Sequence, residues 1–248
     1  MNSNIEWKQW GKFDPLYAVS SWDGKQKDGP KPWTDNEFYS LGASDWGDFY
    51  GHWKRYGLES GHCLEIGCGA GRITMQLAHF FQKVTALDVS ESMIQYASRN
   101  VRSDSVSFIL TDGDRLPLLA NSVTAVFSAH VFQHFDSLAD IAFTLQESYR
   151  VLRVNGTLMV HLPLHNWPFM PLLLSKAYGW HQQMARLRAN CKRALIRLGT
   201  WLPIMRYQSV DMDYVFDYLP ELGFKEVEVA VFRVQSNMHP HPFVLARK

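Results

Sequence analysis

A glycine-rich segment and a carboxylate beyond it carry the clearest chemical signal. Residues 67–71 read GCGAG after an apolar run, and Asp88 follows Gly67 by 21 residues, at the end of the next apolar run. Glycines permit a tight turn and close ligand approach, and an acid so placed can accept both ribose hydroxyls of an adenosine. The spacing differs from the dinucleotide form G-x-G-x-x-G, and the nearby Glu65 would repel a pyrophosphate. NAD is therefore disfavoured, and an adenosine bearing an amino acid is favoured.

Two histidines are candidates for proton transfer. His134 follows the expected fourth strand, and His161 ends the fifth. Imidazole titrates near neutrality, so either could act as a general base, although both could instead be structural. His130 ranks below them. No metal site is expected, because the three cysteines lack metal-ligand spacing.

Alternating strands and helices must position these groups. Such alternation is typical of an α/β, doubly wound, mostly parallel sheet whose ligands bind at the carboxyl ends of the strands. Up to residue 45 the chain looks irregular, except that Thr34 and Glu37 predict a capping box that starts a short helix. We expect strands at 62–66, 83–88, 106–110, 122–128, 157–161, 225–234 and 241–248, and helices at 72–81, 90–100 (N-capped by Ser90), 138–152 and 209–222.

Several segments together make the chain resemble the class I S-adenosylmethionine-dependent methyltransferases. They are LEIGCGAGR at 64–72, ALDVS at 86–90, TDGDRLP at 111–117, HVFQH at 130–134 and VLRVNG at 151–156. The resemblance covers roughly residues 57–162 and the last strands. It implies a seven-stranded, Rossmann-like sheet with an antiparallel last strand. It also implies S-adenosylmethionine as cofactor and S-adenosylhomocysteine as product.

The resemblance also assigns roles to residues. The three glycines of 67–71 would cradle the methionine part, Asp88 would bind the ribose, and Asp112 would contact the adenine, with Asp114 as a competing assignment. Simpler alternatives are a turn at Asp112, a helix cap at Asp88 and plain packing for Cys68. The full expected cofactor set is Tyr17, Glu65, Gly67, Cys68, Gly69, Gly71, Asp88, Val89, Met93, Asp112, Gly113, Ser128 and Ala129.

Charge and spacing suggest a domain organisation. We expect an N-terminal cap segment at 1–56 and a methyltransferase domain at 57–248, with a helical lid insertion after strand five at 162–207. The net charge is +1, but nine basic residues and no acidic ones fall between 148 and 210, which leaves −8 elsewhere. A helix at 181–198 would present much of this charge. It could be a solvated face, recognise an acidic substrate or contact an anionic membrane surface.

The predicted function is methyl transfer from S-adenosylmethionine to oxygen or nitrogen of a small-molecule acceptor. Alternatives are a lipid or quinone-like acceptor at a membrane surface, and a non-catalytic S-adenosylmethionine-binding protein. A nucleic-acid substrate is disfavoured, because the fourth strand lacks the Asn/Asp-Pro-Pro-aromatic motif of base methyltransferases. With no signal peptide and no run of about 20 apolar residues, a cytoplasmic protein is expected. The sequence indicates no oligomeric state.

Overall fold

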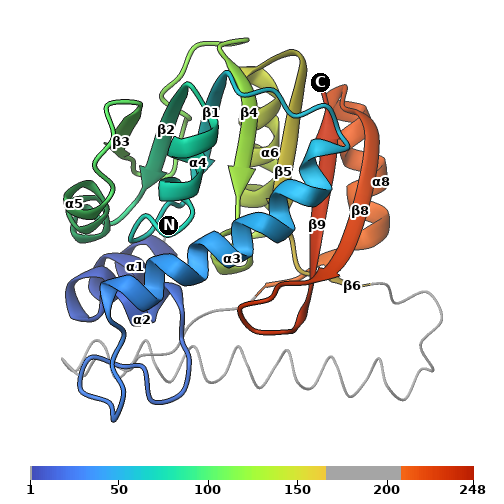
Figure 1. Cartoon of the computed structure of the whole chain (residues 1–248). Coiled ribbons are helices and arrows are strands. Elements are labelled where there is room, and N and C mark those ends of the chain that lie inside the picture. Colours follow the sequence, from blue (N-terminus) through green and yellow to red (C-terminus); the bar gives the residue numbers. More distant parts are fainter. Residues whose placement is uncertain (1, 166–207) are drawn as a thin grey trace, which may run out of the picture.

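The computed structural model describes residues 2–165 and 208–248. Its centre is a seven-stranded sheet of order β3-β2-β1-β4-β5-β9-β8 (Figure 1). The short strands β6 (Leu164–His165) and β7 (Val210–Asp211) form a separate pair. The strands of the large sheet are β1 (His62–Ile66), β2 (Lys83–Asp88), β3 (Val106–Leu110), β4 (Val123–Ser128), β5 (Leu152–His161), β8 (Lys225–Arg233) and β9 (Pro240–Arg247).

Neighbouring strands β1 to β5 run parallel, whereas β9 lies antiparallel between β5 and β8. This arrangement confirms the predicted doubly wound fold with its antiparallel last strand. One predicted boundary is wrong: β5 starts at Leu152 rather than at residue 157, so Asn155 and Gly156 lie inside it. Asn155 has a φ of 63°, and the pairing of β4 with β5 shifts register between Val123 and Ala125. The strand thus begins earlier than its apolar pattern indicates.

Helices cover both faces of the sheet (Figure 1). On one face α3 and α4 bury Phe49, Trp53 and Leu77 against the strands, while on the other α6 and α8 bury Ile141 and Leu219. Because strand residues alternate between the two faces, the sheet supplies both apolar layers. The helices are α1 (Asn2–Phe13), α2 (Pro15–Val19), α3 (Asp35–Lys54), α4 (Thr74–Phe80), α5 (Glu91–Asn100), the 3₁₀ turn η1 (Phe132–His134), α6 (Leu138–Val151) and α8 (Met212–Leu222).

The sequence suggested that the first 45 residues are irregular. In the structure they are largely helical. The predicted capping box of Thr34 and Glu37 is confirmed, and the helix that it starts runs for 20 residues. The indole nitrogen Nε1 of Trp53, at the end of that helix, donates to Thr157 Oγ1 in β5 at 3.0 Å. Before it, Asp14 caps α2 by accepting from the Tyr17 amide. The aromatic residues of this segment therefore pack into the fold, consistent with their density.

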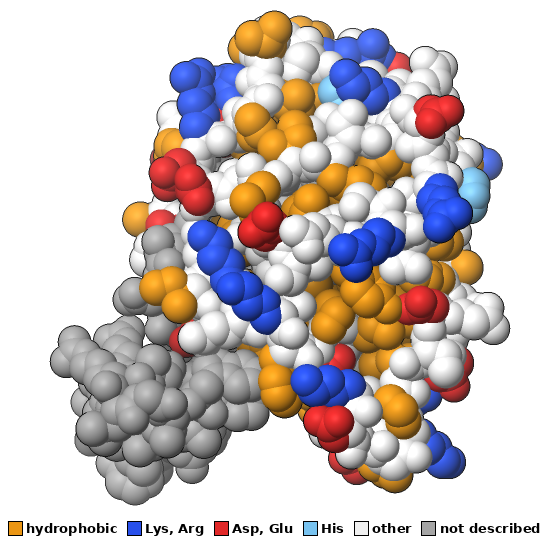
Figure 2. All heavy atoms as spheres, turned by 90° about the vertical axis from the view of Figure 1, so that its left-hand side faces the viewer, with side chains coloured by type: hydrophobic (Ala, Val, Ile, Leu, Met, Phe, Trp, Pro, Cys, Tyr) orange, Lys and Arg blue, Asp and Glu red, His pale blue; other side chains and the backbone are white. Residues whose placement is uncertain are grey.

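Most of the predicted lid, including the helix at 181–198, lies outside the described residues. Of the nine basic residues between 148 and 210, the structure describes Arg150 and Arg153. They form ion pairs with Glu147 and Glu59, respectively. On the side of the molecule shown in Figure 2, basic side chains are scattered among acidic and apolar ones rather than gathered in one patch. No helix in the described ranges is long and apolar enough to cross a membrane.

Candidate active site

A cavity of about 560 Å³ opens at the carboxyl ends of the parallel strands, between the sheet and the N-terminal helices. We call residues 67–71 together with Asp88 its loop half. The side chains of His130, His134, His161 and His241 form what we call its histidine half. Of the predicted site residues, those lining the cavity are Gly67, Cys68, Gly69, Asp88, Val89, Met93, Gly113, Ala129, His134 and His161.

The loop half depends on backbone conformations that favour glycine. Gly67, Gly69 and Gly71 have φ values of +73°, +53° and +85°. A Cβ atom on Gly67 would lie 2.3 Å from Val131 Cγ2, which is too close for any real contact. The Gly67 and Cys68 amides both donate to the Leu87 carbonyl at 2.8 Å, which ties the loop to β2. Gly71 does not line the cavity but allows close packing against α5.

Asp88 joins the loop to the next helix. Its Oδ2 accepts from the Gly69 amide at 2.8 Å and its Oδ1 from the Ser90 amide at 2.9 Å. Burial raises the pKa of this carboxyl, and the hydrogen bonds from the backbone oppose that rise. Ser90 stands at the N-cap position as predicted, but its hydroxyl makes no cap hydrogen bond. Asp88 therefore ties the glycine loop to the start of α5 and still lines the cavity.

Two predicted cofactor residues lie behind the loop half rather than in it. Glu65 is 3% exposed, and its Oε2 accepts from Thr74 Oγ1 at 2.6 Å. Burial raises the pKa of this carboxyl to about 7. The Ser128 hydroxyl donates to the Ile66 carbonyl at 2.9 Å, so it joins β4 to β1. Neither residue lines the cavity, whereas Ala129 next to Ser128 does.

Tyr17 and Asp112 also do not line the cavity. The Tyr17 hydroxyl accepts from Gln26 Nε2 at 3.2 Å, and the Asp112 carbonyl accepts from Asn4 Nδ2 at 2.7 Å. Gly113 and the competing candidate Asp114 line the wall instead. Two aromatic side chains of the N-terminal region do line the cavity, although the sequence did not single them out for this role. These are Trp7 in α1 and Trp22 after α2.

The two predicted catalytic histidines differ in their surroundings. His134 lies in η1, where its Nε2 lies 2.9 Å from the side-chain amide of Gln133 and its ring meets Trp7 edge to face at 4.8 Å. His161 ends β5 and is 2% exposed. Burial, with the nearby His241 and His134, lowers the pKa of its imidazole to about 3. His161 is therefore a weak proton acceptor near neutral pH.

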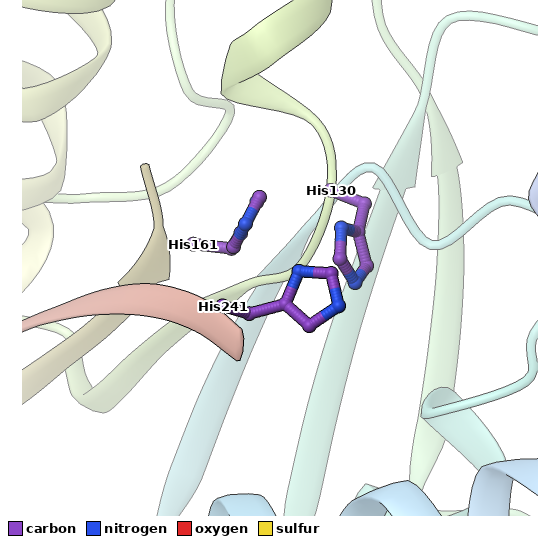
Figure 3. A group of neighbouring side chains, drawn as sticks. All are labelled: His130, His161 and His241. Atoms are coloured by element: carbon purple, nitrogen blue, oxygen red, sulfur yellow. The ribbon is translucent and has the colours of Figure 1, made fainter. Parts of the chain in front are cut away.

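His130 and His241 complete the histidine half, although the sequence ranked His130 low. The ring centroids of His130 and His161 are 4.3 Å apart, and His241 lies 4.8 and 5.3 Å from them. The rings come from the ends of β4 and β5 and the start of β9 (Figure 3). Burial lowers the pKa of both added rings. No local sequence pattern links positions so far apart in the chain.

Comparison with known proteins agrees with this geometry. Residues 64–160 match the family model of the methyltransferase domain. The chain is similar to a malonyl-[acyl-carrier protein] O-methyltransferase from Priestia megaterium, with 37% identity over 98 residues. That match covers 39% of this chain and 34% of the relative. A protein of the same name from Bacillus cereus is 35% identical over 133 residues, covering 53% of this chain and 42% of the relative. The chain thus spans less than half the length of these relatives.

Solved structures share the fold at low sequence identity. A methyltransferase from Thermotoga maritima superposes with a TM-score of 0.55 and 15% identity, covering 86% of this chain and 94% of that one. One from Methanosarcina mazei gives 0.53 and 17%, covering 77% and 94%. The strand order with its antiparallel last strand, the glycine loop and the matched domain lead to one conclusion. Residues 64–160 form a methyltransferase domain, and the sheet and glycine loop are those of the class I S-adenosylmethionine-dependent methyltransferase fold.

Proposed function

We propose that this chain transfers a methyl group from S-adenosylmethionine to oxygen or nitrogen of a small-molecule acceptor bound in the histidine half. The observation that carries the proposal is that one cavity joins the loop half to the histidine half. An acceptor beside the histidines would therefore share a single enclosed space with the cofactor. Alignment in such a space supplies much of the rate enhancement of a displacement reaction.

The loop half fits the cofactor. At Gly67 and Gly69 any Cβ would clash with Val131 or Val19, and both glycines face the cavity. The Asp88 oxygens each accept one amide hydrogen, and a carboxylate has lone pairs left for two hydroxyl groups of a ribose. When bound, S-adenosylmethionine supplies a methyl group already activated by its sulfonium. Gly67, Gly69 and Asp88 would hold it, with Met93 and Gly113 along the adenosine.

His134 is the proposed proton acceptor for a hydroxyl or protonated amine. Its ring lines the cavity, and the contacts with Gln133 and Trp7 orient it. His161 was the second candidate from the sequence, but an imidazole with a pKa of about 3 accepts protons poorly. In this proposal the His161 ring lines the histidine half, where the acceptor binds, and does not accept a proton. An oxygen acceptor is supported by the relatives named as O-methyltransferases.

Calorimetry with S-adenosylmethionine and S-adenosylhomocysteine tests the cofactor site, and micromolar binding of both is expected. Release of S-adenosylhomocysteine is then followed with a panel of hydroxyl, carboxyl and amine acceptors. The panel is run with and without anionic liposomes. Failure to bind either cofactor form would refute the proposal. Turnover only with liposome-borne acceptors would favour the lipid alternative, and binding with no turnover on any acceptor would favour the non-catalytic one.

A further inference from the structure

Three imidazole rings lie close together in the histidine half of the cavity. One nitrogen from each of His130, His161 and His241 lies within 4.8 Å of the other two. Figure 3 shows the three rings around one gap. They come from the ends of two parallel strands and the start of the antiparallel β9. All three also line the cavity, so the gap is reachable by a ligand.

One of the three rings has a buried polar atom that lacks a partner. His161 is 2% exposed, and among the residues that the structure describes its Nδ1 has no hydrogen-bond partner. Leaving such an atom unsatisfied costs about 1–3 kcal/mol. A buried polar atom of this kind in a native fold points to an ordered water or an ion. The remaining question is which of the two the surroundings favour.

The chemistry of the three rings favours a metal ion. Neutral imidazole is a preferred ligand of Zn²⁺, Cu²⁺, Fe²⁺ and Ni²⁺, and burial keeps these rings neutral near pH 7 by lowering their pKa. A tetrahedral ion with bonds of about 2.1 Å needs nitrogens about 3.4 Å apart. The widest separation would therefore close by about 1.4 Å, within reach of small side-chain rotations.

The neighbouring groups suit such a site. The His241 Nε2 lies 3.0 Å from the side-chain amide of Asn237, which orients the ring and leaves its Nδ1 available. Arg72 is a positive charge close enough to lower the pKa of His130. Its guanidinium is paired with the buried Asp45 carboxylate, so the pair carries no net charge. His134 and His239 also face the cavity but stand outside the cluster.

We propose that His130, His161 and His241 bind one divalent transition-metal ion and leave its fourth position open to the cavity. Three protein ligands with one open position is the arrangement of sites that also bind a substrate or water. The sequence suggested no metal, because the three positions are far apart in the chain. Binding of the acceptor's oxygen or nitrogen at the fourth position rests on the proposed function. Binding of the metal ion by the three histidines does not rest on it.

The test uses the full chain after treatment with a chelator. Zn²⁺ binding is measured by calorimetry, and Co²⁺ binding by its visible absorption, which reports tetrahedral coordination. One ion per chain is expected. His241→Ala and His130→Ala should each weaken affinity at least about 100-fold, more than the 10–100-fold typical of a lost outer-shell group. His239→Ala, in the same loop as Asn237, is the matched control and should leave affinity unchanged.

Three outcomes would overturn the proposal. They are no uptake of either ion, equal uptake by the wild type and His241→Ala, and an ordered water in the gap of a crystal soaked in Zn²⁺. S-adenosylhomocysteine binding is measured on the same samples. If it persists while metal binding fails, the metal site alone is refuted. If metal binds but S-adenosylhomocysteine does not, the proposed function fails and the metal site stands.

Discussion

Main-chain groups do most of the hydrogen bonding in the loop half, whereas the histidine half is lined by rings with few hydrogen bonds. In the loop half the Gly67, Cys68, Gly69 and Ser90 amides all have acceptors on β2 or on Asp88. In the histidine half the His161 Nδ1 has none among the described residues. The loop half consists mainly of main-chain groups, so the local backbone conformation determines its geometry. The histidine half consists of side-chain rings from several strands, which come together only when the sheet folds.

The largest effect is expected from His134→Ala. Loss of a general base lowers turnover by about 100- to 10,000-fold, while S-adenosylhomocysteine affinity should stay at the wild-type value because the loop half is untouched. Steady-state kinetics and calorimetry on the same preparation measure both. A joint loss of turnover and cofactor affinity would show that the two halves are not separable. Unchanged turnover would remove His134 from the mechanism.

Gly67→Ala should break the loop half. The φ of +73° and the Val131 methyl 2.3 Å from the new Cβ require a backbone shift, and strain of about 1–3 kcal/mol predicts a roughly 10- to 100-fold loss of cofactor affinity. Calorimetry with S-adenosylhomocysteine measures it. Gly47→Ala is the control, because a Cβ there meets nothing within 4 Å. That substitution should leave binding unchanged and add up to about 1 kcal/mol of stability. Equal affinities in the two variants would contradict the role of the loop.

Glu65→Gln tests the carboxyl buried behind the loop. Its folded pKa of about 7 exceeds the ordinary value of 4.5, so its stabilising contribution is present at acid pH and is lost as pH rises through 7. Between pH 5 and pH 8 the wild type should lose about 2 kcal/mol of unfolding free energy relative to Glu65→Gln. Urea unfolding at the two pH values measures this difference. Parallel pH profiles would show that Glu65 does not titrate in this range.

Trp7→Ala tests whether the aromatic side chain that contacts His134 helps to orient it. The edge-to-face contact with His134 is worth about 0.5–1.5 kcal/mol, so kcat/KM should fall by up to about 10-fold. The control is Ile5→Ala on the same helix, which is 57% exposed and should have no effect. Steady-state kinetics of the two variants measures the difference. Equal values would mean that α1 does not help orient His134.

Local patterns predicted the sheet and the loop half well. Apolar runs, the spacing of Asp88 and the capping box of Thr34 depend on neighbours in sequence, and each is found where expected. The first two helices were missed, because Gly11 and the polar residues of α1 weaken any helical pattern, and α1 packs on α5 and α2 rather than on the sheet. The cluster of His130, His161 and His241 needed the strand order itself. Tyr17 was chosen for its ring alone, and the path of α2 directs that ring to Gln26 instead.

The last residue pairs with β5 far from the cavity. Lys248 exchanges backbone hydrogen bonds with Asn155 and Gly156, and its ammonium donates to the Tyr149 carbonyl. Figure 1 shows this end of the chain near the opposite ends of the strands from α1. A reporter or surface anchor attached after Lys248 would therefore leave the cavity mouth clear. The same attachment ahead of Ser3, which lines the cavity, would crowd it. Immobilised assays of this protein should hold it by its carboxyl end.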